Sequence, residues 1–398
     1  MRRALVSVLG LAAATALCEH AEADDVDRVK IEATASASFD SNVAHSGAAL
    51  AAQRGITPRD TVISPTVSID LSLPVGLQQL FLKGSVGYDF YGRNSQLNSQ
   101  DINLTGGVAA RLRACKATLT GSVDDASTDL AQLAATVTHN VENTDTIGVS
   151  ADCGRQVGLG PTFSFTQRWS SNSAAQMFQS DSRSTSATAG IAYRRPQFGE
   201  LELIGSVGRT DFPNREIQVD GASIQDGYRQ YGVGVRYDRR LGARIQGTFE
   251  LGYIALQPDL PRVQDYHGPY YRADVSLRIS SRLQAQLQAE RSINPTNVTD
   301  ATYDLRDLIS GALDYVVTPK IKLHLAASDT TDNYNGGAFV SGVVVTHQVT
   351  RVLTASSHFQ LNRRAAIDMW VTQEVGNADL RSYDYTDNRV GVSISVTI

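Results

Sequence analysis

Cysteine is scarce in this chain, with three residues in 398. One of them, Cys18, lies close to the N-terminus, so the remaining two cannot form the dense disulfide framework of a small secreted scaffold. Beyond the N-terminal segment, no apolar run approaches the length of about 20 residues that a transmembrane helix requires. The net charge of −5 at pH 7 is small and negative, so nucleic acid is not an expected partner.

The chain also lacks the short motifs that carry much enzyme chemistry. It contains no CxxC, HExxH, Walker A or GxSxG sequence. Its histidines are scattered without the spacing of metal ligands. We therefore expect no enzyme activity, no metal site and no cofactor, and keep an outer-membrane hydrolase only as a distant alternative.

The N-terminus has the layout of a secretory signal peptide. Positive Met1–Arg3 precedes the apolar run Ala4–Leu17, and Ala21–Ala23 supplies the small residues of a cleavage site. Cys18 raises a lipoprotein alternative, which is disfavoured because the residue before it is not small. We expect residues 1–23 to be a signal peptide and residues 24–398 to form a single domain.

A two-residue period runs along the rest of the chain. The last segment, Val390–Ile398, places an apolar or β-branched residue at every second position, and Ile245–Tyr253 and Leu283–Glu290 alternate in the same way. Such segments are about 10 residues long, whereas soluble strands average about 5–6. A soluble sandwich would also alternate. The long strands, and the charges within their polar sets, favour a transmembrane β-barrel.

The predicted connections alternate in length. Short turns are expected at Leu73–Gly76, Arg113–Ala114, Arg239–Gly242, Ser280–Arg282, Thr318–Lys320 and Gln348–Thr350. Long loops are expected at Asp40–Arg59, Gly92–Gln100, Asp124–Asn143, Asp211–Gly227, Gln257–Pro269 and Arg363–Asp387. This alternation is typical of short periplasmic turns and long external loops, and it requires an even strand count. We predict an all-β fold, a transmembrane antiparallel up-and-down β-barrel of about 18 strands, with 16 as the alternative.

The polar set of each strand is expected to face the lumen. The lumen-facing candidates are Lys83, Asp89, Arg111, Arg236, Asp238, Glu250, Arg272, Asp274, Arg278, Gln284, Gln286, Gln288 and Glu290. Charges of both signs in a water-filled bore would set its selectivity. Alternatively, they pair across neighbouring strands and hold the wall together. The glutamines could hydrogen-bond sugar hydroxyls, or fill a wet wall as neutral residues.

The two remaining cysteines are a disulfide candidate. Cys115 opens the fifth predicted strand just after a short turn, and Cys153 closes the sixth. These strands are antiparallel neighbours, so both cysteines should lie at the periplasmic end with the same parity. An oxidising periplasm would favour the bond. A register slip of two residues would separate them, and each would then be a small lipid-facing residue.

Four short segments resemble strand boundaries of a known family. They are Ala37–Val43, Gly87–Tyr91, Asn140–Thr144 and Asn388–Val392. Their sequences are similar to those of the outer-membrane β-barrel porin family associated with exopolysaccharide gene clusters. The resemblance implies an outer-membrane barrel connected with polysaccharide export, and it brings no catalytic residues.

We therefore expect a porin-like channel in the outer membrane of a Gram-negative bacterium, for exopolysaccharide export or saccharide transport. The alternative is a non-conducting structural barrel that partners envelope proteins. The expected partners are outer-membrane lipid, the barrel assembly machinery, and polysaccharide or export-complex proteins, with no nucleic acid. The sequence alone does not identify the solute, the state of the bore or the oligomeric state.

Overall fold

The structure is a computed structural model that describes residues 29–398, apart from 114, 131–138, 156, 220–221, 262, 297–300 and 337–344. Of residues 217–219 and 222 it describes the backbone alone. The predicted signal peptide, residues 1–23, lies outside the described residues.

The described residues form one antiparallel sheet of 18 strands. The strands are β1 (Val29–Asp40), β2 (Asp60–Val75), β3 (Gln78–Tyr91), β4 (Ser99–Leu112), β5 (Cys115–Ser127), β6 (Val141–Asp152), β7 (Gly158–Asn172), β8 (Ser182–Arg195), β9 (Gly199–Val219), β10 (Ala222–Leu241), β11 (Ile245–Pro258), β12 (Tyr266–Arg278), β13 (Leu283–Asn294), β14 (Tyr303–Thr318), β15 (Ile321–Asn335), β16 (His347–Gln360), β17 (Ala365–Ala378) and β18 (Tyr385–Thr397). The predicted fold class and the count of 18 are confirmed, and the alternative of 16 is wrong.

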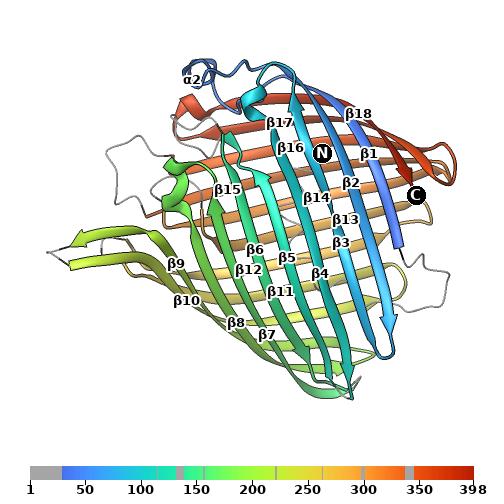
Figure 1. Cartoon of the computed structure of the whole chain (residues 1–398). Helices are drawn as coiled ribbons and strands as arrows, with labels where there is room; N and C mark the ends of the chain where they lie inside the picture. Colours follow the sequence, from blue (N-terminus) through green and yellow to red (C-terminus); the bar gives the residue numbers. More distant parts are fainter. Residues whose placement is uncertain are drawn as a thin grey trace.

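The sheet closes into a barrel where the chain's two ends meet. Each strand pairs with the next along the chain, and β18 pairs back onto β1. This seam runs from Glu32 opposite Thr397 to Asp40 opposite Arg389. Figure 1 shows blue β1 beside red β18. Closure pairs the backbone groups that an open sheet edge would leave unsatisfied.

Short turns join the strands at one end of the barrel. Gly76 and Gly242 lie in two of these turns with φ of 63° and 64°, a conformation that glycine adopts without a steric penalty. The longer connections gather at the other end, the long-loop end. They carry helix α2 (Ala48–Gln53) and the 3₁₀ turns η1 (Ser95–Leu97), η3 (Ala175–Ser180) and η4 (Arg381–Tyr383).

Three predicted connections are wrong. Gln348–Thr350 lies inside β16, and Arg363–Asp387 contains β17. The two-residue alternation of apolar and polar residues is weak in β17, because the aromatic Trp370 is on the same face as Asp368 and lies over Gly391. Much of Asp211–Gly227 belongs to strands, because β9 and β10 continue as a hairpin that projects to the left in Figure 1. Beyond the barrel, neither face of a strand needs an apolar set, so the alternation fades.

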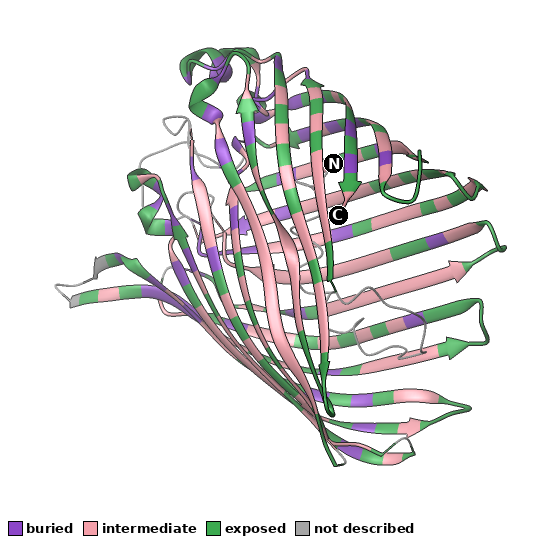
Figure 2. Ribbon diagram, turned by 45° about the vertical axis from the view of Figure 1, so that its right-hand side comes forward, coloured by how far each residue is buried: buried purple, intermediate pink, exposed green. Residues whose placement is uncertain are grey.

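Exposed and less exposed residues alternate along the wall of the barrel, as the banding in Figure 2 shows. Large apolar residues such as Leu203, Leu251 and Ile309 are 58–64% exposed. Buried apolar residues instead gather in three small clusters near the long-loop end. Among the described residues, no helix is both long and apolar enough to span a bilayer.

Candidate functional site: the polar face of the wall and its long-loop end

The strand register defines two faces of the wall. Directly paired residues in an antiparallel sheet lie on the same face. One row across the sheet joins Leu203, Val235, Leu251 and Tyr271, and the next joins Glu202, Arg236, Glu250 and Arg272. We call the first side the apolar face and the second side the polar face.

All the lumen-facing candidates lie on the polar face in this register. They are Lys83, Asp89, Arg111, Arg236, Asp238, Glu250, Arg272, Asp274, Arg278, Gln284, Gln286, Gln288 and Glu290. The structure brings ten of them together on the four neighbouring strands β10 to β13. Lys83, Asp89 and Arg111 lie apart, on β3 and β4.

Several of these charges pair across neighbouring strands. The Arg236 guanidinium lies 3.0 Å from Glu202 and 2.8 Å from Glu250. Lys83 Nζ lies 3.1 Å from Asp70 Oδ2, and Asp238 accepts a hydrogen bond from Thr248. Pairing holds these side chains against the wall and reduces the net field of each row. Both sequence interpretations, selectivity and wall cohesion, are compatible with this arrangement.

An acidic arc lies at the long-loop end of the polar face, and Asp89 is the one member of it that was predicted from the sequence. Each of the six strands β1 to β6 carries a carboxylate within four residues of this end. The acidic arc consists of Asp40, Asp60, Asp89, Asp101, Asp124 and Glu142. On the same strands, the polar-face bases Lys30, Lys83, Arg111 and Lys116 lie closer to the short turns. The alternation of residues along each strand places these carboxylates on the polar face. Only the pairing between strands shows that they lie beside one another at one end of the barrel.

Helix α2 lies among connections from both sides of the long-loop end. Around Ala51 pack Val43, Ala44, Ile56, Leu97, Leu130 and Met177. Around Leu50 pack Ala301, Tyr334, Val345 and Tyr383. The first long connection, residues 41–59, therefore contacts the connections that follow β3, β5 and β7 as well as those near β14, β15 and β17.

Two histidine–aspartate pairs lie on the polar face near the short turns. His324 Nδ1 is 2.8 Å from Asp314, and His358 Nδ1 is 2.8 Å from Asp368. Ser356 is opposite His324 in the register. The described part of the chain shows no hydrogen bond between this serine and the histidine, which a nucleophile and its base would need.

Cys115 and Cys153 form a disulfide in the structure, with their Cα atoms 3.9 Å apart. In the β5–β6 register Lys116 pairs with Asp152, and the two cysteines are the next residues beyond this pair, towards the short turns. Both lie at the short-turn end, on neighbouring strands, as their spacing predicted.

A profile of the family described as "Putative beta-barrel porin 2" matches residues 218–398, which confirms the predicted resemblance to β-barrel porins over this part of the chain. No curated protein matches.

Several solved structures match most of the chain at low sequence identity. OccK2 (OpdF) of Pseudomonas aeruginosa in complex with glucuronate is 12% identical with a TM-score of 0.48, over 93% of this chain and 98% of that chain. OccAB3 of Acinetobacter baumannii is 10% identical with a TM-score of 0.45, over 93% and 99%. The siderophore receptor PirA of Pseudomonas aeruginosa is 9% identical with a TM-score of 0.41, over 94% and 81%.

Proposed function

We propose that this protein is a channel of the Gram-negative outer membrane, with the polar face lining a water-filled bore. The observation that carries the proposal is the closed barrel with one apolar and one polar face. Lipid is the surrounding that makes exposed Leu203, Leu251 and Ile309 favourable, since a soluble protein rarely exposes a continuous apolar belt. Mature residues 24–398 would be inserted by the barrel assembly machinery after removal of the signal peptide.

The solutes that we propose are saccharides, including segments of an exopolysaccharide in export. Gln284, Gln286 and Gln288 line up on the polar face of β13, and each amide can both donate and accept hydrogen bonds with a sugar hydroxyl. The porin-like match of residues 218–398 includes this strand. Transport through such a wall requires positioning and weak binding, and no catalytic group.

A second candidate function is a structural barrel that does not conduct and that partners envelope proteins. The packing of α2 against connections from both sides of the long-loop end favours it, because buried Leu50 and Ala51 fix residues 41–59 among the other loops. The pairing of Arg236 with two glutamates is also what a cohesive wall needs.

Single-channel recording in a planar bilayer distinguishes the two functions. We expect the refolded mature protein to give discrete conductance steps. Replacement of residues 47–56 by a Gly–Ser linker should enlarge them, since it removes α2 from the long-loop end. If neither protein conducts while both insert as folded barrels, the channel is refuted and the structural barrel is favoured.

Liposome swelling tests the saccharide proposal separately. Vesicles containing the barrel should swell in isotonic monosaccharide and disaccharide solutions, and more slowly as the sugar becomes longer. Gln286→Ala combined with Gln288→Ala should change the rates for sugars more than the rate for glycine. A barrel that conducts ions but excludes every sugar would contradict the saccharide proposal and leave the channel intact.

A further inference from the structure

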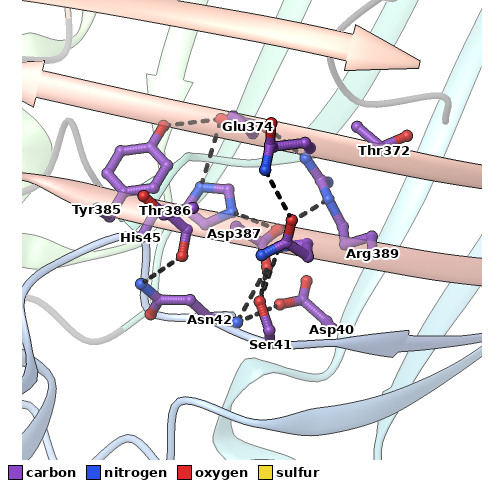
Figure 3. A network of polar contacts seen from close by, with 12 residues as sticks. Asp40, Ser41, Asn42, His45, Thr372, Glu374, Tyr385, Thr386, Asp387 and Arg389 are labelled. Carbon is purple, nitrogen blue, oxygen red and sulfur yellow. Dashed lines mark hydrogen bonds and ion pairs between the residues drawn. The ribbon is translucent and has the colours of Figure 1, made fainter.

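A cluster of metal-ligating side chains lies where the barrel closes at the long-loop end. Asp40 is the last residue of β1, and the chain then turns so that His45 lies against β17 and β18 (Figure 3). Glu374 and Asp387 come from these two strands, and Asp129 comes from the connection after β5. The cluster therefore combines residues from both ends of the chain, which no local motif could indicate.

The His45 ring is held in a fixed position. It stacks on the Tyr385 ring with 4.8 Å between centroids and 2° between planes. Its Nδ1 lies 2.9 Å from Asp129 Oδ1, and its Nε2 lies 3.6 Å from Asp387 Oδ2. When Nδ1–H donates to Asp129, the Nε2 lone pair faces Asp387. A carboxylate behind the distal nitrogen is the usual support of a metal-ligating histidine.

Asp387 has a buried carboxylate oxygen, Oδ2, that makes no hydrogen bond and faces His45 Nε2. Its side chain has 0% exposure, and its Oδ1 accepts hydrogen bonds from Ser41 Oγ and the Asn42 backbone N–H. Its Oδ2 has no hydrogen-bond partner, although Arg389 Nε lies 2.9 Å away as an ion pair without hydrogen-bond geometry. An oxygen with available lone pairs thus points into the cluster from a fully buried side chain.

The cluster has more negative than positive charge. Four carboxylates, those of Asp40, Asp129, Glu374 and Asp387, surround the ring. Among the described residues, the guanidinium of Arg389 contacts Glu374 and Asp387, and that of Arg54 lies within electrostatic reach of Asp129. With His45 neutral and all four carboxylates ionised, two negative charges would remain. Buried charge without compensation is costly, so the site favours a divalent cation.

We propose that Asp40, His45 and Asp387 bind one divalent transition-metal ion, with Zn²⁺ as the best fit. Their ligand atoms all lie within 4.8 Å of one another. Two ligands of tetrahedral zinc, with bonds of about 2.0–2.1 Å, lie about 3.3 Å apart, which is close to the 3.6 Å between His45 Nε2 and Asp387 Oδ2. One imidazole with two carboxylates suits zinc or manganese better than calcium, which prefers oxygen ligands alone.

The bound ion would tie residues 41–47 to the barrel seam. Asp40 and Asp387 belong to the two strands that close the barrel, and His45 belongs to the connection that carries α2. The ion would thus stabilise both the seam and the position of α2. Asp129, which is bonded to the other ring nitrogen, is a positioning residue that links the connection after β5 to the same site.

Equilibrium dialysis against ZnCl₂ tests the proposal. The mature protein would be refolded in detergent, freed of any purification tag and treated with EDTA. We expect one Zn²⁺ per chain by mass spectrometry, and a loss of affinity of at least about tenfold in His45→Gln and in Asp387→Asn. His324→Gln is the matched control, because His324 also contacts an aspartate but lies near the short turns. Binding that fails in the native protein, survives in His45→Gln or is lost in His324→Gln would overturn the proposal.

X-ray absorption of the native protein with zinc needs no variant and so does not depend on how the variants fold. The spectrum should show one imidazole and otherwise oxygen neighbours. Sulfur, or two imidazoles, would place the metal elsewhere and overturn the assignment. Both readouts are independent of conductance, so they do not depend on the proposed channel.

Discussion

Neighbouring residues on one strand of this barrel face opposite surroundings, and β13 illustrates the consequence at the scale of the residue. Leu287 is 53% exposed on the apolar face, where it pairs with Val275. The next residue, Gln288, pairs with Asp274 on the polar face. A single step along the chain therefore exchanges lipid for water if the barrel spans a membrane.

Arginine substitutions at these two positions should differ in cost. Leu287→Arg places a charge in lipid near the middle of the strand and should destabilise the barrel by about 2–4 kcal/mol. Gln288→Arg keeps the charge in water and should cost much less. Equilibrium unfolding by guanidinium in lipid vesicles, followed by tryptophan fluorescence, measures both. Equal losses would show that the two faces are not in different solvents.

The acidic arc should make the bore prefer cations. Glu142→Gln removes one of its charges, so the reversal potential in a KCl gradient should shift towards lower K⁺ selectivity. Asp145→Asn is the matched control, because Asp145 lies on the same strand but pairs with Val123 and Trp169 on the apolar face. An equal shift in both variants would mean that the arc does not act on the permeating ion.

Asp379, in the connection between β17 and β18, provides a pH test outside the barrel wall. Burial by itself raises the pKa of the Asp379 carboxyl. The hydrogen bonds from the hydroxyl and backbone N–H of Thr346 and from the His347 N–H lower this pKa by more than burial raises it, so the net pKa lies below its usual value. A depressed carboxylate pKa stabilises the fold above the unfolded-state pKa, and this contribution is lost as pH falls through the folded-state pKa.

NMR titration of the Asp379 carboxyl carbon checks this shift. Its midpoint should lie below the reference of about 3.9, and it should move back up in Thr346→Val, which removes the hydroxyl donor. A midpoint at or above the reference in the native protein would contradict the hydrogen-bonded arrangement.

At the scale of the element, a strand is well predicted from the sequence where one of its faces is apolar and the other is polar. β11, β12 and β13 have one apolar and one polar face along most of their length, so their alternation is clear. β17 is hard to recognise as a strand in the sequence, because Trp370 puts a large aromatic ring on the polar face, over Gly391. The alternation is lost in the part of β9 and β10 that projects beyond the barrel, because neither of its faces needs an apolar set there.

The metal cluster lies beyond sequence reasoning for a different reason. His45 and Asp387 meet only because the barrel closes, since they lie near opposite ends of the described part of the chain. The resembling segments Ala37–Val43 and Asn388–Val392 do meet there, since Asn388 N–H donates to Ser41 Oγ. Sequence identified both segments as strand boundaries, but only the register shows that they adjoin.

The pair Cys115–Cys153 links two neighbouring strands at the short-turn end and gives a prediction at this scale. Thiol labelling of the mature protein, denatured without reductant, should modify no cysteine, whereas prior reduction should expose two. The oxidising periplasm favours the bond, and the direct β5–β6 register brings the residues together. Two reactive thiols without reductant would rule the disulfide out.

At the scale of the whole molecule, stability depends on closure, because every strand has two neighbours only when β18 pairs with β1. Disrupting the barrel then requires breaking several ladders together rather than fraying one edge. We expect the mature protein to keep its compact form in SDS at room temperature and to migrate more slowly on a gel after boiling. Far-UV circular dichroism of the unheated sample should be dominated by β-structure.

A truncation after Arg389 makes this prediction specific to the seam. It removes Val390–Ile398 and with them the pairs from Phe39–Val390 to Glu32–Thr397, so β1 and β17 both lose most of a neighbour. The truncated chain should run at one position with or without boiling. As the control, Ile398→Phe leaves those pairs intact and should keep the heat-dependent shift. A truncated chain that still shifts on heating would mean that closure by β18 is not the source of the resistance, and a full chain recovered in the soluble periplasmic fraction would refute the transmembrane barrel itself.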